Sequence, residues 1–261
     1  MTLRNKTALV TGSTSGIGLG VANALAAEGA NIMLNGFGDA EAIDRLVADL
    51  AARHGVEVDY DGADLLRADG PGELVESTRA RFGTLDVLVN NAGIQHVAPV
   101  ESFPIERWDA IIALNLSAVF LSMRAAIPIM RAQGWGRIIN VASAHGLVAS
   151  ANKVAYVAAK HGVLGATKVA ALELANDAIT VNAICPGWVL TPLVERQLEE
   201  RAAAAGTELA AESDAMLAEK QPMRQFTSPE AIGALAVYLC SDAARTVTGT
   251  PISIDGGWVA Q

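Results

Sequence analysis

The chain has 261 residues, of which 51% are hydrophobic and 18% are charged. Such a chain can bury enough apolar surface to offset the entropy lost on ordering, which excludes a wholly disordered protein. The length fits one large domain, so we expect a single domain over residues 1–261. The net charge of −9 would repel phosphate backbones and anionic lipid, so neither nucleic acid nor a membrane is an expected partner.

The sequence also indicates where the protein works. No uncharged apolar run of about 18 residues is found, so no bilayer-spanning helix is expected. Only three apolar residues, at 8–10, follow the first basic residues before a Thr-Gly pair, which is too short for the core of a secretory signal. Cys185 and Cys240 lie in apolar stretches and are predicted to be buried small side chains rather than a disulfide. Together these features predict a cytoplasmic protein.

Short apolar runs alternate along the chain with longer segments of helical periodicity. The runs predict strands at 7–10, 31–34, 56–60, 86–89, 137–141, 179–184 and 251–254. The periodic segments predict helices at 17–27, 41–53, 73–81, 105–132, 156–175 and 231–239, the fourth disturbed near Pro128. This alternation predicts an α/β fold, a doubly wound parallel seven-stranded sheet of Rossmann type. Ligands bind such sheets beyond the carboxyl ends of the strands, so function is expected in the loops there.

Residues 191–223 interrupt this alternation, because they are too many for an ordinary connection. Two charge-rich helical segments are predicted here, at 192–205 and 208–220, between Gly187 and Pro222. An insertion after the sixth strand could fold over a bound ligand as a lid. A pair of surface helices without a gating role is the alternative.

A glycine-rich segment follows the first strand, with Gly12, Gly16 and Gly18 spaced G-x-x-x-G-x-G. Glycines at this place let the backbone turn sharply and expose its N–H groups to a pyrophosphate at the start of a helix. Three glycines can also be ordinary turn chemistry. Their position between the first strand and the first helix favours a dinucleotide site.

The choice of dinucleotide depends on the end of the second strand. No lysine or arginine occurs over residues 35–39 or 12–18, so the 2′-phosphate of NADP would lack a cation. Asp39 and Glu41 would repel that phosphate further, and the sequence therefore favours NAD.

Two further segments could contact the cofactor. Asp64 could accept a hydrogen bond from the adenine amino group, although it could equally begin a helix. The fourth strand ends in amide and small residues, Asn90-Asn91-Ala92-Gly93, which suits the close approach of a cofactor but is also compatible with a simple turn.

Ser143, Tyr156 and Lys160 are the residues on which the functional interpretation depends. Tyr156 and Lys160 lie four residues apart in a predicted helix, so the lysine ammonium can approach the phenolic oxygen. Lowering a tyrosine pKa from about 10 to about 7 takes roughly 4 kcal/mol, much of which a desolvated neighbouring cation can supply. The phenolate would act as general base for alcohol oxidation, with Ser143 hydrogen-bonded to the reacting oxygen.

Taken together, these motifs and Cys185-Pro186-Gly187 resemble the short-chain dehydrogenase/reductase family, in order and over the whole chain. The resemblance implies that Asn115 is a fourth catalytic residue, which helps to hold a water between the lysine and solvent. From its position alone, a polar residue in an apolar helix, Asn115 would be expected to make a structural hydrogen bond. Many NAD-using members have an aspartate at the end of the second strand, where this chain has residues 35–37, Asn-Gly-Phe.

The expected contacts of the NAD cofactor extend over most of these loops. They are Gly12, Thr14, Ser15, Gly16, Ile17, Gly18, Phe37, Asp64, Leu65, Asn91, Ala92, Gly93, Tyr156, Lys160, Pro186, Gly187, Val189 and Thr191. No metal site is predicted.

Polar and aromatic side chains gather at the expected mouth of this site. Lys153 and His145 could neutralise a carboxylate, the amides of Gln95 and Gln197 could donate to it, and Trp188 could form a wall. The set favours a small carboxylate over a steroid. Singly, Lys153 could be a solvated cation, His145 a cap and Trp188 a core residue. The expected substrate site comprises Gln95, Ser143, His145, Lys153, Tyr156, Trp188 and Gln197.

Residues 90–96, 143–153, 185–188 and 219–222 more closely resemble the bacterial members of the family that interconvert (R)-3-hydroxybutanoate and acetoacetate with NAD. The resemblance implies this reaction and its stereochemistry. It also implies a homotetramer built through the long helices that begin at Ile105 and near Tyr156. A 3-oxoacyl-thioester reductase, a polyol dehydrogenase and a catalytically silent dinucleotide sensor remain alternatives.

Overall fold

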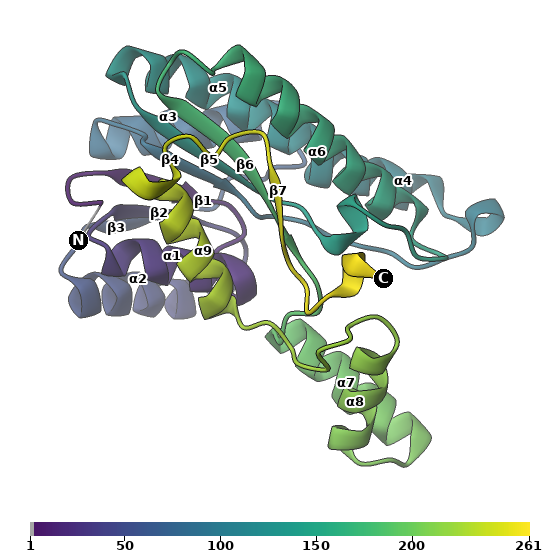
Figure 1. The fold of residues 1–261 in the computed structure, drawn as a ribbon. Coiled ribbons are helices and arrows are strands. Elements are labelled where there is room, and N and C mark those ends of the chain that lie inside the picture. Colours follow the sequence, from purple (N-terminus) through teal and green to yellow (C-terminus); the bar gives the residue numbers. More distant parts are fainter. Residues whose placement is uncertain (1–2) are drawn as a thin grey trace.

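The computed structural model describes residues 3–261, apart from the side chain of Leu193, and is built on one parallel sheet (Figure 1). Its strands are β1 (Thr7–Val10), β2 (Asn31–Asn35), β3 (Val58–Asp61), β4 (Val87–Asn90), β5 (Gly136–Val141), β6 (Ile179–Pro186) and β7 (Pro251–Ile254). They lie in the order β3-β2-β1-β4-β5-β6-β7, and every pairing between them is parallel. The order reverses between β1 and β4, which is where a doubly wound sheet opens a crevice for ligands. The predicted fold class is confirmed.

Helices cover both faces of the sheet (Figure 1). On one face lie α3 (Gly70–Phe82), α5 (Ala118–Gln133) and α6 (Val154–Glu173), with α4 (Ile105–Ile112) beyond them. On the other lie α1 (Gly16–Ala27), α2 (Ala40–His54) and α9 (Pro229–Cys240). Side chains of β1 alternate between the two cores, Leu9 facing the first and Ala8 and Val10 the second. A strand buried on both faces needs apolar residues at every position, which explains its unbroken apolar run.

Most element boundaries differ from the prediction by one or two residues, and the start of the third helix differs by three. The third strand is β3, at Val58–Asp61 rather than 56–60, and the third helix begins at Gly70 rather than at residue 73. The helix start needs glycine at residue 70, because a Cβ there would lie 2.1 Å from the Asp64 carbonyl oxygen.

The expected disturbance of the fourth helix at Pro128 is wrong. Pro128 lies inside α5 with its side chain exposed, and the helix continues past it. The break comes earlier, at a π-helical turn, η2 (Ala113–Ser117), which separates α4 from α5. Turns of this kind insert one extra residue and often occur at functional sites, and this one contains Asn115.

The stretch Ile105–Gln133 is the one segment within residues 3–261 that is long and apolar enough to cross a membrane by length and composition, with a mean hydropathy of 1.8. Its side chains also build the core, since Met123, Ala126 and Met130 are buried in the cluster beneath β4 and β5. A core helix passes the same test, so this segment is assigned to the core.

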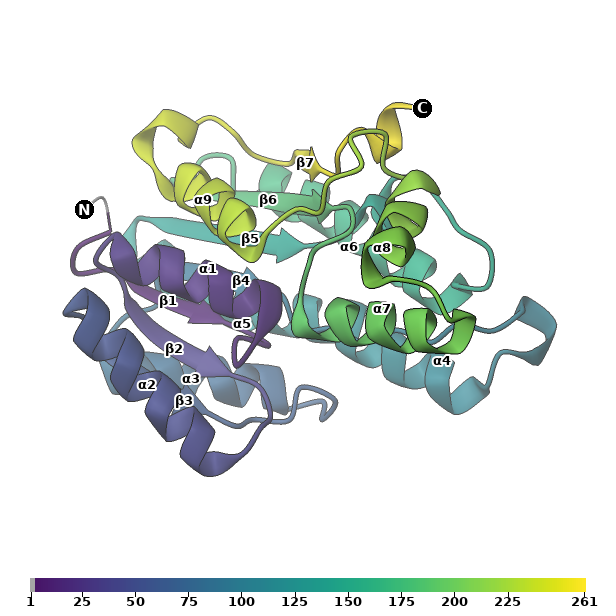
Figure 2. The same ribbon diagram turned by 90° about the horizontal axis from the view of Figure 1, so that it is seen from below.

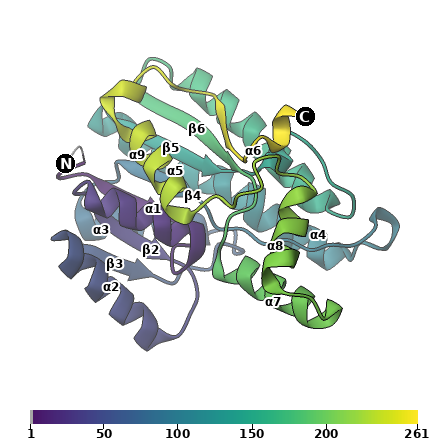
Figure 3. The same ribbon diagram turned by 60° about the horizontal axis from the view of Figure 1, so that its bottom comes forward.

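Two helices, α7 (Pro192–Ala205) and α8 (Leu209–Ala218), follow β6 and occupy the region of the predicted lid. They pack side by side (Figures 2 and 3). They stand apart from the two helical layers, beyond the carboxyl ends of the strands (Figure 1).

Candidate active site

A cleft of about 780 Å³ opens at the carboxyl ends of the strands, where the sheet order reverses. The segments that follow all seven strands line it, together with the first residues of α6 and α7. Every residue predicted to contact the substrate lies on its wall, as does every residue predicted to contact the cofactor except Gly18. Segments far apart in sequence meet here because parallel strands end at one edge of the sheet.

The glycines form the floor of the cleft. Gly12 has a φ of +62°, and a Cβ there would lie 2.9 Å from the Ala92 Cα. Gly18 lies behind the wall, where a Cβ would be 2.3 Å from the Gly12 carbonyl oxygen. The Asn91 side chain closes this contact, since its Nδ2 donates to the carbonyl oxygens of Thr11 at 2.9 Å and Gly12 at 3.0 Å. Gly18 therefore allows the close packing against Gly12 and does not itself line the cleft.

Helix α1 begins at this floor, and Ser15, just before it, makes no side-chain capping bond within the described chain. The first N–H groups of such a helix are free to bind an anion. Glycines let the protein backbone come close to a ligand, and here they lie next to the start of a helix. This arrangement fits the pyrophosphate of a dinucleotide.

The end of β2 has Asn35 at the position considered above for the choice of dinucleotide. Asn35 is buried, and its Nδ2 donates to the carbonyl oxygens of Asp61 at 3.0 Å and Ala63 at 3.1 Å. Its amide thus ties β2 to the end of β3 and is used structurally. Phe37 is 71% exposed and forms the rim of the cleft. Asp64 lines the cleft, and its carboxylate accepts from Leu66 N at 2.9 Å. The alternative that Asp64 begins a helix is wrong, because α3 begins at Gly70, after Asp69.

Ser143, Tyr156 and Lys160 meet on one wall of the cleft. Ser143 follows β5 and is buried, and its Oγ accepts from His145 N at 3.1 Å. Tyr156 and Lys160 lie one turn apart on α6, with the ammonium 5.6 Å from the centroid of the phenol ring. The Lys160 Nζ donates to the carbonyl oxygen of Val141, on β5, at 2.7 Å. The three side chains can therefore act on one small molecule.

The charge state of this wall differs from the expectation. Burial raises the pKa of the Tyr156 phenol above its ordinary value, while its hydrogen bond with Ser143 opposes that shift. Burial lowers the pKa of the Lys160 ammonium to about 8. The expected lowering of the tyrosine pKa by Lys160 is thus wrong, because desolvation dominates and the Lys160 Nζ donates to the Val141 carbonyl oxygen.

Asn115 lies in the π-helical turn and is fully buried, outside the lining of the cleft. Its Oδ1 accepts from Ile94 N and its Nδ2 donates to Ile94 O, both at 2.9 Å. Both polar atoms thus hold one backbone unit of the loop after β4. This is the structural hydrogen bond expected from the sequence pattern, and it fixes the loop that carries Gly93 and Gln95.

Aromatic rings form a continuous wall at the substrate end. The Lys153 ammonium lies 5.4 Å from the Trp188 ring centroid, and Trp188 lies 6.0 Å from Trp258. His145 packs edge-on against Trp258 at 5.0 Å and against Tyr156 at 5.9 Å. The wall leads from the lysine cation to the phenol, so it is suited to a short molecule with an anionic group at one end.

His145 does not supply the positive charge that was expected of it. Burial, together with the nearby Lys153 ammonium, lowers the pKa of the His145 imidazole to about 4, so the ring is neutral near pH 7. Its Nε2 lies 2.9 Å from the Ser150 hydroxyl, a hydrogen bond that a neutral ring can make. Burial and the Arg201 charge also lower the pKa of the Lys153 ammonium. Lys153 thus carries a positive charge at the substrate end, Arg196 of α7 also lines the cleft, and His145 contributes only hydrogen bonding and packing.

Two residues at this end had no predicted role, although Gln221 lies within the stretch 219–222 quoted for the resemblance. Trp258 lies in a short helix after β7 and lines the cleft. Its only sequence signal is a tryptophan directly after Gly256 and Gly257, past the carboxyl end of the last strand. Gln221, which follows α8, is buried behind the cleft and accepts from Trp188 N at 2.8 Å. Nothing in its local sequence distinguishes it from an exposed glutamine.

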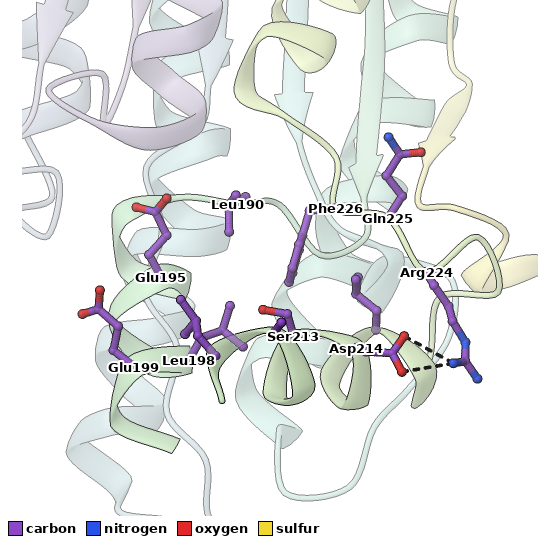
Figure 4. Close-up of a pocket in the computed structure, with 12 residues that line it drawn as sticks. Leu190, Glu195, Leu198, Glu199, Ser213, Asp214, Arg224, Gln225 and Phe226 are labelled. Carbon is purple, nitrogen blue, oxygen red and sulfur yellow. Dashed lines mark hydrogen bonds and ion pairs between the residues drawn. The ribbon is translucent and has the colours of Figure 1, made fainter. Parts of the chain in front are cut away.

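A second cavity, of about 570 Å³, lies between α7 and α8 and the segment that follows them (Figure 4). Leu198 and Phe226 face it, and Arg224 pairs with Asp214 at 3.2 Å on its rim. It contains none of the residues predicted for the site. It separates part of the two helices from the segment after α8.

Comparisons with known proteins agree with this geometry. Residues 12–259 match the family model described as enoyl-(acyl carrier protein) reductase. The chain is 58% identical over 259 residues to the D-beta-hydroxybutyrate dehydrogenase of Cupriavidus necator, covering 99% of this chain and 100% of that protein. It is 51% identical over 257 residues to the protein of the same name from Rhizobium meliloti, covering 98% and 99%.

Solved structures share the whole fold. A variant of actinorhodin polyketide ketoreductase with NADPH is similar with a TM-score of 0.89 at 34% identity, over 98% of each chain. Levodione reductase is similar with a TM-score of 0.89 at 33% identity, over 99% of each chain. From the fold, the cleft and these full-length similarities, the chain belongs to the short-chain dehydrogenase/reductase family.

Proposed function

We propose that this chain is an NAD-dependent dehydrogenase that interconverts (R)-3-hydroxybutanoate and acetoacetate. The observation that carries the proposal is the aromatic wall that joins the Lys153 ammonium to the Tyr156 phenol inside a dinucleotide-sized cleft. A short hydroxy acid needs both ends of that wall: a cation for its carboxylate and a proton acceptor for its hydroxyl. The relatives named D-beta-hydroxybutyrate dehydrogenase, similar over their full length, support the same substrate, and they are the source of the (R) configuration.

Oxidation removes a hydride from the hydroxyl-bearing carbon and a proton from its hydroxyl oxygen. When bound, NAD supplies the hydride acceptor for oxidation and, as NADH, the donor for reduction. The Tyr156 phenolate takes the hydroxyl proton, and Ser143 holds the reacting oxygen by a hydrogen bond. Lys160 places its positive charge next to the phenol. Asn115 supports the loop after β4 and is proposed to pass protons to solvent through a water. Gln95, Gln197 and Lys153 orient the carboxylate, so that the substrate presents one face.

The preference for NAD over NADP is supported by the rim at Phe37. Residues 35–43 contain no lysine or arginine, and the Asp39 carboxylate there caps α2 by accepting from Ala42 N at 2.9 Å. A 2′-phosphate at this rim would meet an acidic surface. We expect kcat/KM with NAD to exceed that with NADP by at least about tenfold, which corresponds to roughly 1.4 kcal/mol.

An assay of NADH formation tests the reaction. The purified chain receives NAD with (R)-3-hydroxybutanoate, its (S) enantiomer or a neutral polyol, and separately NADPH with a 3-oxoacyl thioester. We expect turnover with the (R) acid only. Faster turnover of the polyol or of the thioester would instead support one of those two rival activities, and no turnover with any of them would support a silent sensor.

A pair of tyrosine variants tests the proposed acid–base group. Tyr156→Phe keeps the ring and removes the hydroxyl, so turnover should fall by roughly 10²- to 10⁴-fold while NADH binding persists. The matched control is Tyr238→Phe, on an exposed part of α9, which should leave turnover unchanged. Near-normal turnover of Tyr156→Phe would contradict the assignment.

The helical pair α7 and α8 is proposed as a lid over the substrate. Val194 and Gln197 of α7 line the cleft, and the second cavity separates part of the pair from the segment that follows it. Ligand binding should therefore protect the amides of residues 192–218 from hydrogen exchange. Unchanged exchange would leave α7 and α8 as a surface pair.

The assembly is proposed to be a homotetramer formed through α5 and α6. Phe120, Val169 and Leu172 expose 53%, 55% and 79% of their surfaces on these helices, which is unusual for large apolar side chains in a neighbouring pair. Light scattering should give four times the chain mass, and Leu172→Glu should reduce the measured mass.

The two buried free thiols, Cys185 and Cys240, support a reducing cytoplasmic location.

A further inference from the structure

Gln221 lies directly behind the substrate end of the cleft, yet it does not line it. It follows α8, and only 1% of its surface is exposed. Its Oε1 accepts from the backbone N–H of Trp188 at 2.8 Å, and its Nε2 donates to the backbone carbonyl oxygen of Gln225. A single buried amide therefore joins the segment that enters α7 to the segment that leaves α8.

The same side chain is wedged between two turns. A Cβ on Gly187 would lie 2.6 Å from the Gln221 Oε1, and a Cβ on Gly256 would lie 2.6 Å from its Cγ. Contacts this close need glycine on both sides. Gly187 precedes Trp188 and Gly256 lies two residues before Trp258, so Gln221 sets the spacing of the two turns that carry the tryptophans.

We propose that Gln221 is a positioning residue that fixes the Trp188 and Trp258 rings and thereby sets the width of the substrate end. The rings lie 6.0 Å apart, and the wall continues through His145 to Tyr156. Because the amide holds the backbone of Trp188 and packs against the turn before Trp258, its loss lets both rings move away from the substrate. The part of this inference that concerns catalysis rests on the proposed function.

Gln221→Met tests the amide alone, because the volume is kept and both hydrogen bonds are lost. We expect the KM for 3-hydroxybutanoate to rise by roughly 3- to 10-fold, the effect of losing a buried hydrogen bond, with kcat and NADH binding within about twofold of wild type. The ratio of kcat/KM for 3-hydroxypentanoate to that for 3-hydroxybutanoate should rise, because a wider wall admits the extra methylene. Gln225→Met is the matched control: its side chain is exposed and only its backbone meets Gln221.

A readout that needs no turnover is fluorine NMR of the chain labelled with 5-fluorotryptophan. The chain has 4 tryptophans, and single Trp→Phe variants assign them. In Gln221→Met the Trp188 and Trp258 signals should shift or broaden, whereas those of Trp108 and Trp135 should stay in place. Gln225→Met should move none of them.

The outcomes separate cleanly. If the wild type fails to oxidise 3-hydroxybutanoate, the proposed function fails, and the fluorine signals alone decide the role of Gln221. Unmoved Trp188 and Trp258 signals would overturn the proposal. So would a lower melting temperature with unchanged KM and selectivity, which indicates a purely structural role, or a fall in kcat and NADH affinity instead of a rise in KM.

Discussion

Replacing Lys153 with methionine tests the recognition of the carboxylate most directly. The methionine keeps an apolar stem against Trp188, whose ring centroid lies 5.4 Å from the Lys153 Nζ, and removes only the charge. His145 cannot compensate, because the pKa of its imidazole is lowered to about 4 and the ring is neutral near pH 7. The variant should therefore bind an anionic substrate poorly and a neutral analogue almost normally.

The size of the effect follows from the environment of the ammonium. At about 4 Å and an effective dielectric constant of about 20, the attraction between two unit charges is roughly 4 kcal/mol. Desolvation of both groups offsets part of it, and a hydrogen bond to a charged group retains about 1.5–3 kcal/mol. The KM for 3-hydroxybutanoate should accordingly rise by roughly 10- to 150-fold in Lys153→Met.

The pH dependence gives a second signature. Burial and the charge of Arg201 lower the pKa of the Lys153 ammonium. The protonated form binds the carboxylate, so affinity is present at low pH and is lost as the pH rises through this lowered pKa. The wild-type KM should thus begin to rise at a lower pH than an exposed lysine, with an ordinary pKa of about 10.4, would allow. In Lys153→Met this alkaline rise should be absent.

The assay compares 3-hydroxybutanoate with its neutral amide, 3-hydroxybutanamide, by initial rates of NADH formation. Lys168→Met, at an exposed position of α6, is the control for loss of one positive charge from the whole molecule. The reasoning would be refuted if Lys153→Met raised the KM of the acid and of the amide equally, or if Lys168→Met did the same.

Three further predictions concern the frame of the site. Gly18→Ala should abolish NADH binding measured by fluorescence, because its Cβ would lie 2.3 Å from the Gly12 carbonyl oxygen; tight binding would contradict the packing argument. Asn115→Ala should lower kcat by roughly 10-fold or more and increase hydrogen exchange at Ile94, whose N–H and C=O lose their partners; unchanged exchange would refute it. NMR titration should give His145 a pKa of about 4 in the free protein. A midpoint near the ordinary histidine pKa of about 6.5 would contradict the effect of burial on this ring.

Most of the architecture could be predicted because it depends on local patterns. The apolar run of β1 reads as a strand buried on both faces, and its residues do alternate between two cores. The break between α4 and α5 could not be predicted in the same way. Proline is a local helix breaker, whereas the π-helical turn accompanies a contact of Asn115 with Ile94, 21 residues away in the chain. Tertiary contacts of this kind leave no mark on helical periodicity.

In the candidate site, too, features that depend on local patterns were predictable and features that depend on tertiary contacts were not. The residues expected to surround the ligands were predictable because loops after parallel strands converge at one edge, and nearly all of them line one cleft. Trp258 and Gln221 were missed because their importance comes from packing against segments distant in sequence. The neutral state of His145 was missed for a related reason: burial, the main cause of its lowered pKa, is a property of the folded chain.

Tyr156, the proposed general base, is held in the protonated form, which alcohol oxidation does not use. Burial raises the pKa of the Tyr156 phenol, and the Lys160 ammonium donates to the Val141 carbonyl oxygen at 2.7 Å. The residues present thus keep the phenol protonated, and a positively charged ring bound beside it would favour the phenolate. Ultraviolet difference titration, with the signal of Tyr156→Phe subtracted to remove Tyr60 and Tyr238, should place the Tyr156 pKa above its ordinary value of about 10 in the free protein. Saturating NAD should move it downward. A free-protein midpoint well below 10 would show instead that Lys160 alone activates the phenol.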